Sequence, residues 1–130
     1  MHSFQEKSKI NPAKKNAVAL KAFFKITDKW GLTSEEESIL LGIPLSTLYR
    51  WKNKKDGVLS HDTLERISYV LGIYKALRIL LPTEDTANQW IKKTNQAFLF
   101  NGKSALDKLM QGHVIDLADV RRYLDAERGW

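Results

Sequence analysis

Apolar residues recur every three or four positions through most of the chain, and no long stretch alternates with a period of two. This spacing is typical of amphipathic helices and gives no support for strands. The pattern predicts helices over residues 13–30, 34–41, 45–54, 60–81 and 84–94, a short helix between Ser104 and Gly112, and a last helix capped by Asp116 and Asp119. The predicted fold class is therefore all-α.

Capping residues mark several of these helix ends. Thr33 and Glu36 have the spacing of a capping box, and Gly42 stands where a helix would end. Gly72 lies inside an apolar helical pattern, so one bent helix and two abutting helices are both compatible with residues 60–81. The apolar residues 64–81 are a candidate for self-association, and they are equally compatible with a core within one chain.

Residues 42–52 are the most informative segment. A turn built on Gly42 and Pro44 leads into a short helix on which Leu48 and Trp51 share one face. We interpret Trp51 as core rather than as a stacking platform. With the preceding helix, this segment predicts a helix-turn-helix, although Glu37 stands where a neutral residue is more usual.

The outward arc of this helix is rich in hydrogen-bond donors, as a helix that enters the major groove of double-stranded DNA requires. Base or nearby phosphate contacts are predicted for Ser46, Thr47, Tyr49 and Arg50, and phosphate contacts for Lys52, Lys54 and Lys55. For each lysine the alternative is a solvated helix end. A helix-turn-helix can also serve only as a protein-interaction scaffold.

Charge is distributed unevenly along the 130 residues, which carry a net +6. Residues 1–60 hold eleven basic and six acidic residues, a balance of +5, whereas residues 61–130 hold ten and nine, a balance of +1. The basic half suggests a polyanionic partner, and the near-neutral half suggests a different one.

Several classes of protein are disfavoured. There is no cysteine, the three histidines have no ligand spacing, and no apolar run approaches the roughly 20 residues of a membrane span. No phosphate loop or nucleophile with a base is apparent. We therefore expect a cytoplasmic protein that is not an enzyme and needs neither metal nor cofactor.

The second half carries motifs that resemble one known family. These are Trp90, Asn95, Phe98 and the runs 102–107 and 120–130. Together with the helix-turn-helix, they resemble the Xre/ParS-like antitoxins that work with RES-domain toxins. Thr94 departs from the pattern, since proline is common there, and the tail has a single glycine before Trp130. The expected organisation is an arm over residues 1–12, a helix-turn-helix and dimerisation domain over 13–81, and a toxin-binding domain over 82–130.

The resemblance implies that the second domain binds a RES toxin, an enzyme that degrades NAD, and covers its active-site entrance. It also implies a homodimer that binds and represses its own promoter. By position, the implied toxin contacts are Lys103, Ser104, Asp107, Arg121, Arg122, Asp125, Glu127, Arg128 and Trp130.

Structural roles are open for the same residues. Ser104 and Asp107 fit a helix cap, and Asp125 is spaced for surface ion pairs with Arg121 or Arg122. Trp130 is compatible with core packing as well as with partner contact. The alternative function is a transcriptional regulator, or a transposon-associated DNA-binding protein, without a toxin partner.

Overall fold

The computed structural model describes residues 12–54 and 58–129. In this part of the chain there are seven helices and no strand, which confirms the all-α class. The helices are α2 Pro12–Lys29, α3 Ser34–Leu41, α4 Leu45–Lys54, α5 His61–Leu80, α6 Glu84–Trp90, α7 Ala105–Leu109 and α8 Val114–Glu127. The predicted arm over residues 1–12 lies outside the described residues, apart from Pro12.

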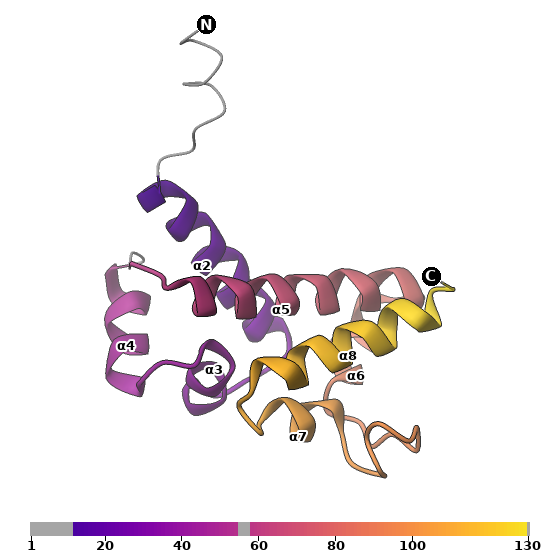
Figure 1. Cartoon of the computed structure of the whole chain (residues 1–130). Coiled ribbons are helices and arrows are strands. Elements are labelled where there is room, and N and C mark those ends of the chain that lie inside the picture. The colour runs from indigo at the N-terminus through magenta and orange to yellow at the C-terminus, as the bar shows by residue number, and fades with distance from the viewer. Residues whose placement is uncertain (1–11, 55–57, 130) are drawn as a thin grey trace, which may run out of the picture.

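The fold is organised around α5, which runs the length of the body (Figure 1). This helix contacts α2, α3, α6 and α8, while α4 packs on α3 and α7 packs on α8. Because elements from both halves of the chain pack on α5, the two halves share one hydrophobic core. The division of the chain after residue 81 stays a prediction.

The apolar side chains of α5 are directed into that core. Ile67, Val70, Ile73 and Leu77 are at most 1% exposed, and Ile79 is the large apolar side chain of this helix that remains exposed. The predicted segment 64–81 is therefore mainly intrachain core. Across the described ranges, no helix has the length and apolarity needed to cross a bilayer.

Gly72 lies within α5, which is one continuous helix and not two. A Cβ atom added at Gly72 would lie 1.7 Å from Nη1 of Arg121 on α8. The glycine therefore makes room for a guanidinium group that crosses the surface of α5. The close approach of α8 to α5 explains why glycine occupies position 72. The glycine does not mark a break in the helix.

Two predicted boundaries are wrong. The helix expected over residues 84–94 ends at Trp90, because Thr94 forms an isolated antiparallel bridge with Ser104. The last helix begins earlier than expected, with His113 as its N-cap residue. Asp116, predicted as a cap, is instead a buried residue of the first turn.

Candidate DNA-binding and toxin-binding surfaces

The helix-turn-helix is formed by α3, the turn at residues 42–44 and α4. Thr33 and Glu36 make both hydrogen bonds of the predicted capping box, with N–O distances of 3.2 and 2.8 Å. At the other end of α3, Gly42 has φ 69° and its N–H donates to the carbonyls of Ser38 and Ile39. These caps fix where α3 ends and therefore where α4 begins.

The next helix, α4, presents a polar face to solvent. Leu48 and Trp51 are 0% and 5% exposed, which confirms that Trp51 belongs to the core. Of the predicted DNA contacts, Ser46, Tyr49, Arg50 and Lys54 are exposed and Thr47 is half-buried. Lys55 lies outside the described residues. The exposed arc is thus accessible to DNA, and individual contacts remain predictions.

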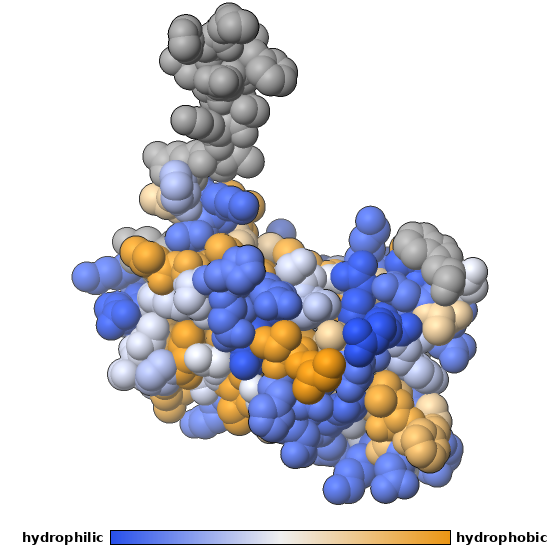
Figure 2. All heavy atoms as spheres, viewed as in Figure 1, coloured by the Kyte–Doolittle hydropathy of each residue, from blue (hydrophilic) through white to orange (hydrophobic). Residues whose placement is uncertain are grey.

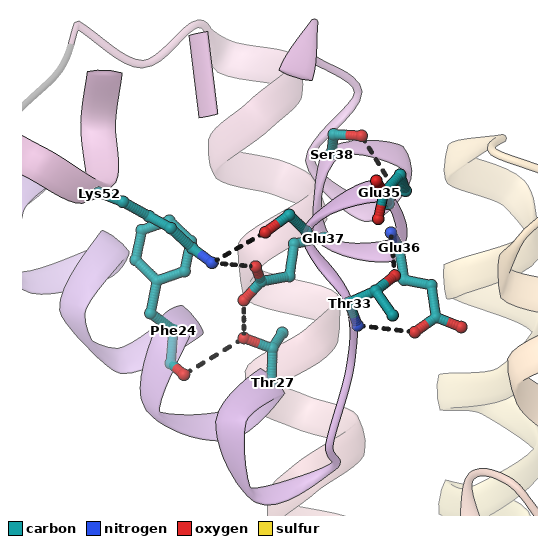
Figure 3. Close-up of polar contacts among 9 residues, drawn as sticks. Phe24, Thr27, Thr33, Glu35, Glu36, Glu37, Ser38 and Lys52 are labelled. Atoms are coloured by element: carbon teal, nitrogen blue, oxygen red, sulfur yellow. Dashed lines mark hydrogen bonds and ion pairs between the residues drawn. The ribbon is translucent and has the colours of Figure 1, made fainter. Parts of the chain in front are cut away.

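Lys52 occupies a different environment from the other lysines of α4 (Figure 3). Its Nζ lies 2.5 Å from Oε1 of Glu37, 3.5 Å from Oγ of Ser34 and 5.4 Å from the ring centroid of Phe24. Lys52 therefore links α4 to α3 within the chain, and a phosphate contact by Lys52 stays a prediction.

Glu37 is the centre of this arrangement. It is 4% exposed, and its Oε2 accepts a 2.5 Å hydrogen bond from Oγ1 of Thr27 on α2. Lys52 compensates the carboxylate charge from the other side, as a buried charge requires. The unusual acidic residue of the sequence pattern thus joins α2, α3 and α4 in one polar network.

In the C-terminal half, a short loop projects between α6 and α7 (Figure 1). Asn95 and Lys103 lie at its base, where Asn95 N–H donates to the Lys103 carbonyl at 2.9 Å. Phe100 is 3% exposed and packs edge-on against Trp90 and Tyr123, with centroid distances of 5.8 and 5.1 Å. This aromatic cluster anchors the loop on α6 and α8.

Ser104 and Asp107 cap α7. Ser104 N–H donates to the Asp107 carboxylate at 3.1 Å, and Asp107 N–H donates to Ser104 Oγ at 3.0 Å. The hydrogen bonds from Ser104, first from its backbone and then from its side chain, lower the pKa of the Asp107 carboxyl. The capping interpretation is confirmed, whereas toxin contact by these two residues stays a prediction.

The predicted contacts on α8 are largely engaged in ion pairs along the helix. Asp125 receives Arg121 at 3.0 Å and Arg128 at 3.5 Å, while Arg122 pairs with Asp119 and not with Asp125. Glu127 is exposed. Trp130 lies outside the described residues.

Lys108 joins α7 to α8 and did not stand out in the sequence. Its Nζ lies 3.0 Å from Oδ1 of Asp116 and 3.3 Å from Oδ2 of Asp119. Burial alone would lower the pKa of Lys108, but hydrogen bonds and charge from these two carboxylates outweigh burial and raise it. A lysine eight residues before its main partner gives no periodic signal, so only the fold reveals the pair.

Comparison with known families matches two consecutive segments of the chain. Residues 10–72 match the antitoxin Xre-like helix-turn-helix domain, and residues 76–129 match the antitoxin Xre/MbcA/ParS C-terminal toxin-binding domain. The chain belongs to the Xre/MbcA/ParS antitoxin family. This antitoxin therefore combines a DNA-binding module with a toxin-binding module, and both matched families are families of binding domains.

One relative covers most of the antitoxin. An uncharacterized protein, y4oB, of Sinorhizobium fredii (strain NBRC 101917 / NGR234) is 50% identical over 111 residues, which is 85% of this chain and 84% of the relative. Among the described residues, no group of three or more histidine or acidic side chains is placed to hold a metal ion.

Proposed function

We propose that this antitoxin neutralises a RES-domain, NAD-degrading toxin by covering its active-site entrance, and that it represses its own operon. The observation that carries the proposal is the match of residues 76–129 to the toxin-binding domain, directly after a matched helix-turn-helix. The choice of a RES toxin rests on the resemblance of the motifs at residues 102–107 and 120–130 to antitoxins that pair with RES toxins.

The structure supports a separation of the two activities. The helix α4, with its exposed residues, lies at the N-terminal end of α5, whereas α8 runs from the middle of α5 to its C-terminal end and the loop between α6 and α7 projects away from α4 (Figure 1). Arg50, exposed on α4, is the best placed to pair with guanine in the major groove. Because operators for helix-turn-helix proteins are generally two-fold symmetric, we propose a homodimer as the DNA-bound form.

The proposed toxin contacts fall into two groups by their surroundings. Lys103, Arg122 and Glu127 are exposed, so a partner can reach them without disturbing the fold. Ser104 and Asp107 cap α7, and Arg121, Asp125 and Arg128 hold one another. We propose that the first group contributes directly to affinity, while the second shapes the surface that presents it.

The test is to look for a RES-domain reading frame beside this gene and to co-express its product, or a RES-domain toxin supplied from elsewhere, with this antitoxin. Wild-type antitoxin is expected to preserve growth and cellular NAD, and charge reversal by Arg122→Glu with Lys103→Glu is expected to reduce protection. Deletion of residues 121–130 is less informative, because it removes Leu124, which is 2% exposed and belongs to the core. NAD loss despite abundant wild-type antitoxin would refute the proposal.

A further inference from the structure

The loop at residues 92–103 is held in one conformation by its own backbone. Gly102 N–H donates to the Asn95 carbonyl at 3.0 Å, and Asn95 N–H donates to the Lys103 carbonyl. Both backbone polar groups of Asn95 are thus bonded to the opposite end of the loop. Oδ1 of Asn95 accepts from the N–H of Ala97 at 2.8 Å. Asn101, with φ 51°, takes the left-handed conformation that closes the loop.

This ordered loop carries an aromatic residue that packs on nothing. Phe98 is 101% exposed, whereas Phe100, two residues later, is 3% exposed. The two side chains therefore have opposite surroundings: Phe100 packs in the core and anchors the loop, whereas Phe98 points into solvent. Figure 2 shows apolar atoms gathered at this end of the molecule, bordered by hydrophilic residues.

The charged residues of the loop itself are all basic. Residues 92–103 contain Lys92, Lys93 and Lys103 and no acidic residue. Nζ of Lys92 donates to the Gly31 carbonyl at 2.9 Å, so Lys93 and Lys103, both exposed, are the basic residues of the loop that a partner can reach most readily. A matching partner surface would have an apolar pocket with an acidic rim.

We infer that the loop at residues 92–103 is the anchor of the toxin interface, with Phe98 inserted into an apolar, acid-rimmed pocket of the toxin. The inference rests on the proposed function, because the loop lies inside the matched toxin-binding domain, residues 76–129. Rigid loops lose little conformational entropy on binding, and aromatic side chains are well suited to serve as interface hot spots. Phe98 thus joins the toxin contacts, although the motif-based set did not include it.

The experiment compares Phe98→Ala with Val58→Ala in the full-length chain, using a purified RES-domain toxin that the wild-type chain binds as the probe. Val58 is the matched control, since it is 92% exposed and lies outside the matched toxin-binding domain. Phe98→Ala is expected to weaken binding about 30-fold, or ~2 kcal/mol, and Val58→Ala less than about twofold. Neither substitution is expected to change the Tm.

A second measurement tests the charge complementarity. Lys93→Glu with Lys103→Glu is expected to slow association with the toxin and to reduce the salt dependence of the association rate. A photoreactive phenylalanine analogue at position 98 is expected to cross-link to the toxin, and the same analogue at position 58 is not.

The outcomes separate the inference from the proposed function. Wild-type binding that survives Phe98→Ala unchanged, with no cross-link from position 98, would overturn the inference alone. Failure to find a RES-domain toxin that the wild-type chain binds would overturn both. Loss of self-association on Phe98→Ala without loss of toxin affinity would assign the loop to a second copy of this chain and also overturn the inference.

Discussion

Substitution of Lys52 by methionine tests whether the pair with Glu37 holds the helix-turn-helix together. Methionine keeps most of the length of the side chain and removes its charge, leaving the Glu37 carboxylate 4% exposed without its cation. Breaking a fully buried pair costs about 3–5 kcal/mol. Because the Lys52 side chain is 36% exposed, water can partly replace the lost ammonium group. We therefore expect Lys52→Met to lower the free energy of unfolding by about 2 kcal/mol.

The assay is thermal or urea unfolding, in which a loss of about 2 kcal/mol lowers the Tm of a domain of this size by roughly 8 °C. Lys54→Met is the matched control, because Lys54 is exposed on the same helix, and it should cost less than about 0.5 kcal/mol. The double variant Glu37→Gln, Lys52→Met should recover part of the loss, since no unpaired charge remains buried.

Equal Tm values for Lys52→Met and Lys54→Met would refute the reasoning, because Lys52 would then behave as an ordinary surface lysine. DNA binding gives an independent check at temperatures where both variants are folded. Removal of a phosphate contact lowers the salt slope by about one, which we expect for Lys54→Met and not for Lys52→Met.

Three further substitutions test the roles of Arg50, Gly72 and Asp107. Arg50→Ala should weaken promoter binding about tenfold in a mobility-shift assay while toxin neutralisation is unchanged, and equal loss of both would contradict the division of labour. Gly72→Ala should raise the free energy of unfolding by about 1 kcal/mol in an Arg121→Ala background. In the wild-type chain no gain is expected, because the added Cβ would contact the Arg121 guanidinium. Equal effects in both backgrounds would show that this contact does not matter. Because hydrogen bonds from Ser104 lower the pKa of Asp107 in the folded chain, wild type should exceed Asp107→Asn in Tm above the ordinary pKa of 3.8, with the advantage shrinking as pH falls below it. A constant Tm difference down to about pH 2.5 would count against that assignment.

Local signals predicted the N-terminal half closely. The α3 and α4 boundaries follow from Thr33, Glu36 and Gly42, whose capping interactions involve residues no more than four positions apart. Such interactions are visible in a linear pattern. The inward positions of Leu48 and Trp51 likewise follow from helical spacing alone.

The features that the sequence did not indicate depend on contacts between distant residues. Lys52 pairs with Glu37 across two helices, and Asp116 pairs with Lys108 across a turn, so neither carboxylate nor lysine shows its role in its own helix. The end of α6 was overestimated because Thr94 pairs with Ser104 ten residues away. Helical periodicity predicts which residues share one face of a helix. It does not predict which residues of another helix contact that face.

The exposure of Phe98 could not be read from the sequence either. Two phenylalanines stand two apart in the same loop, and only the packing of Phe100 against Trp90 and Tyr123 distinguishes them. One is core and the other is surface. The motifs place this loop within the matched toxin-binding domain, and the fold indicates which of its side chains a partner can reach.

Inhibition of a RES-domain toxin by the C-terminal half of this chain is measured as NAD consumption by the purified toxin. With equimolar wild-type chain, NAD consumption is expected to fall to background, and Phe98→Ala is expected to require about 30-fold more protein for the same inhibition. Undiminished NAD consumption at saturating wild-type chain would contradict the proposed inhibition.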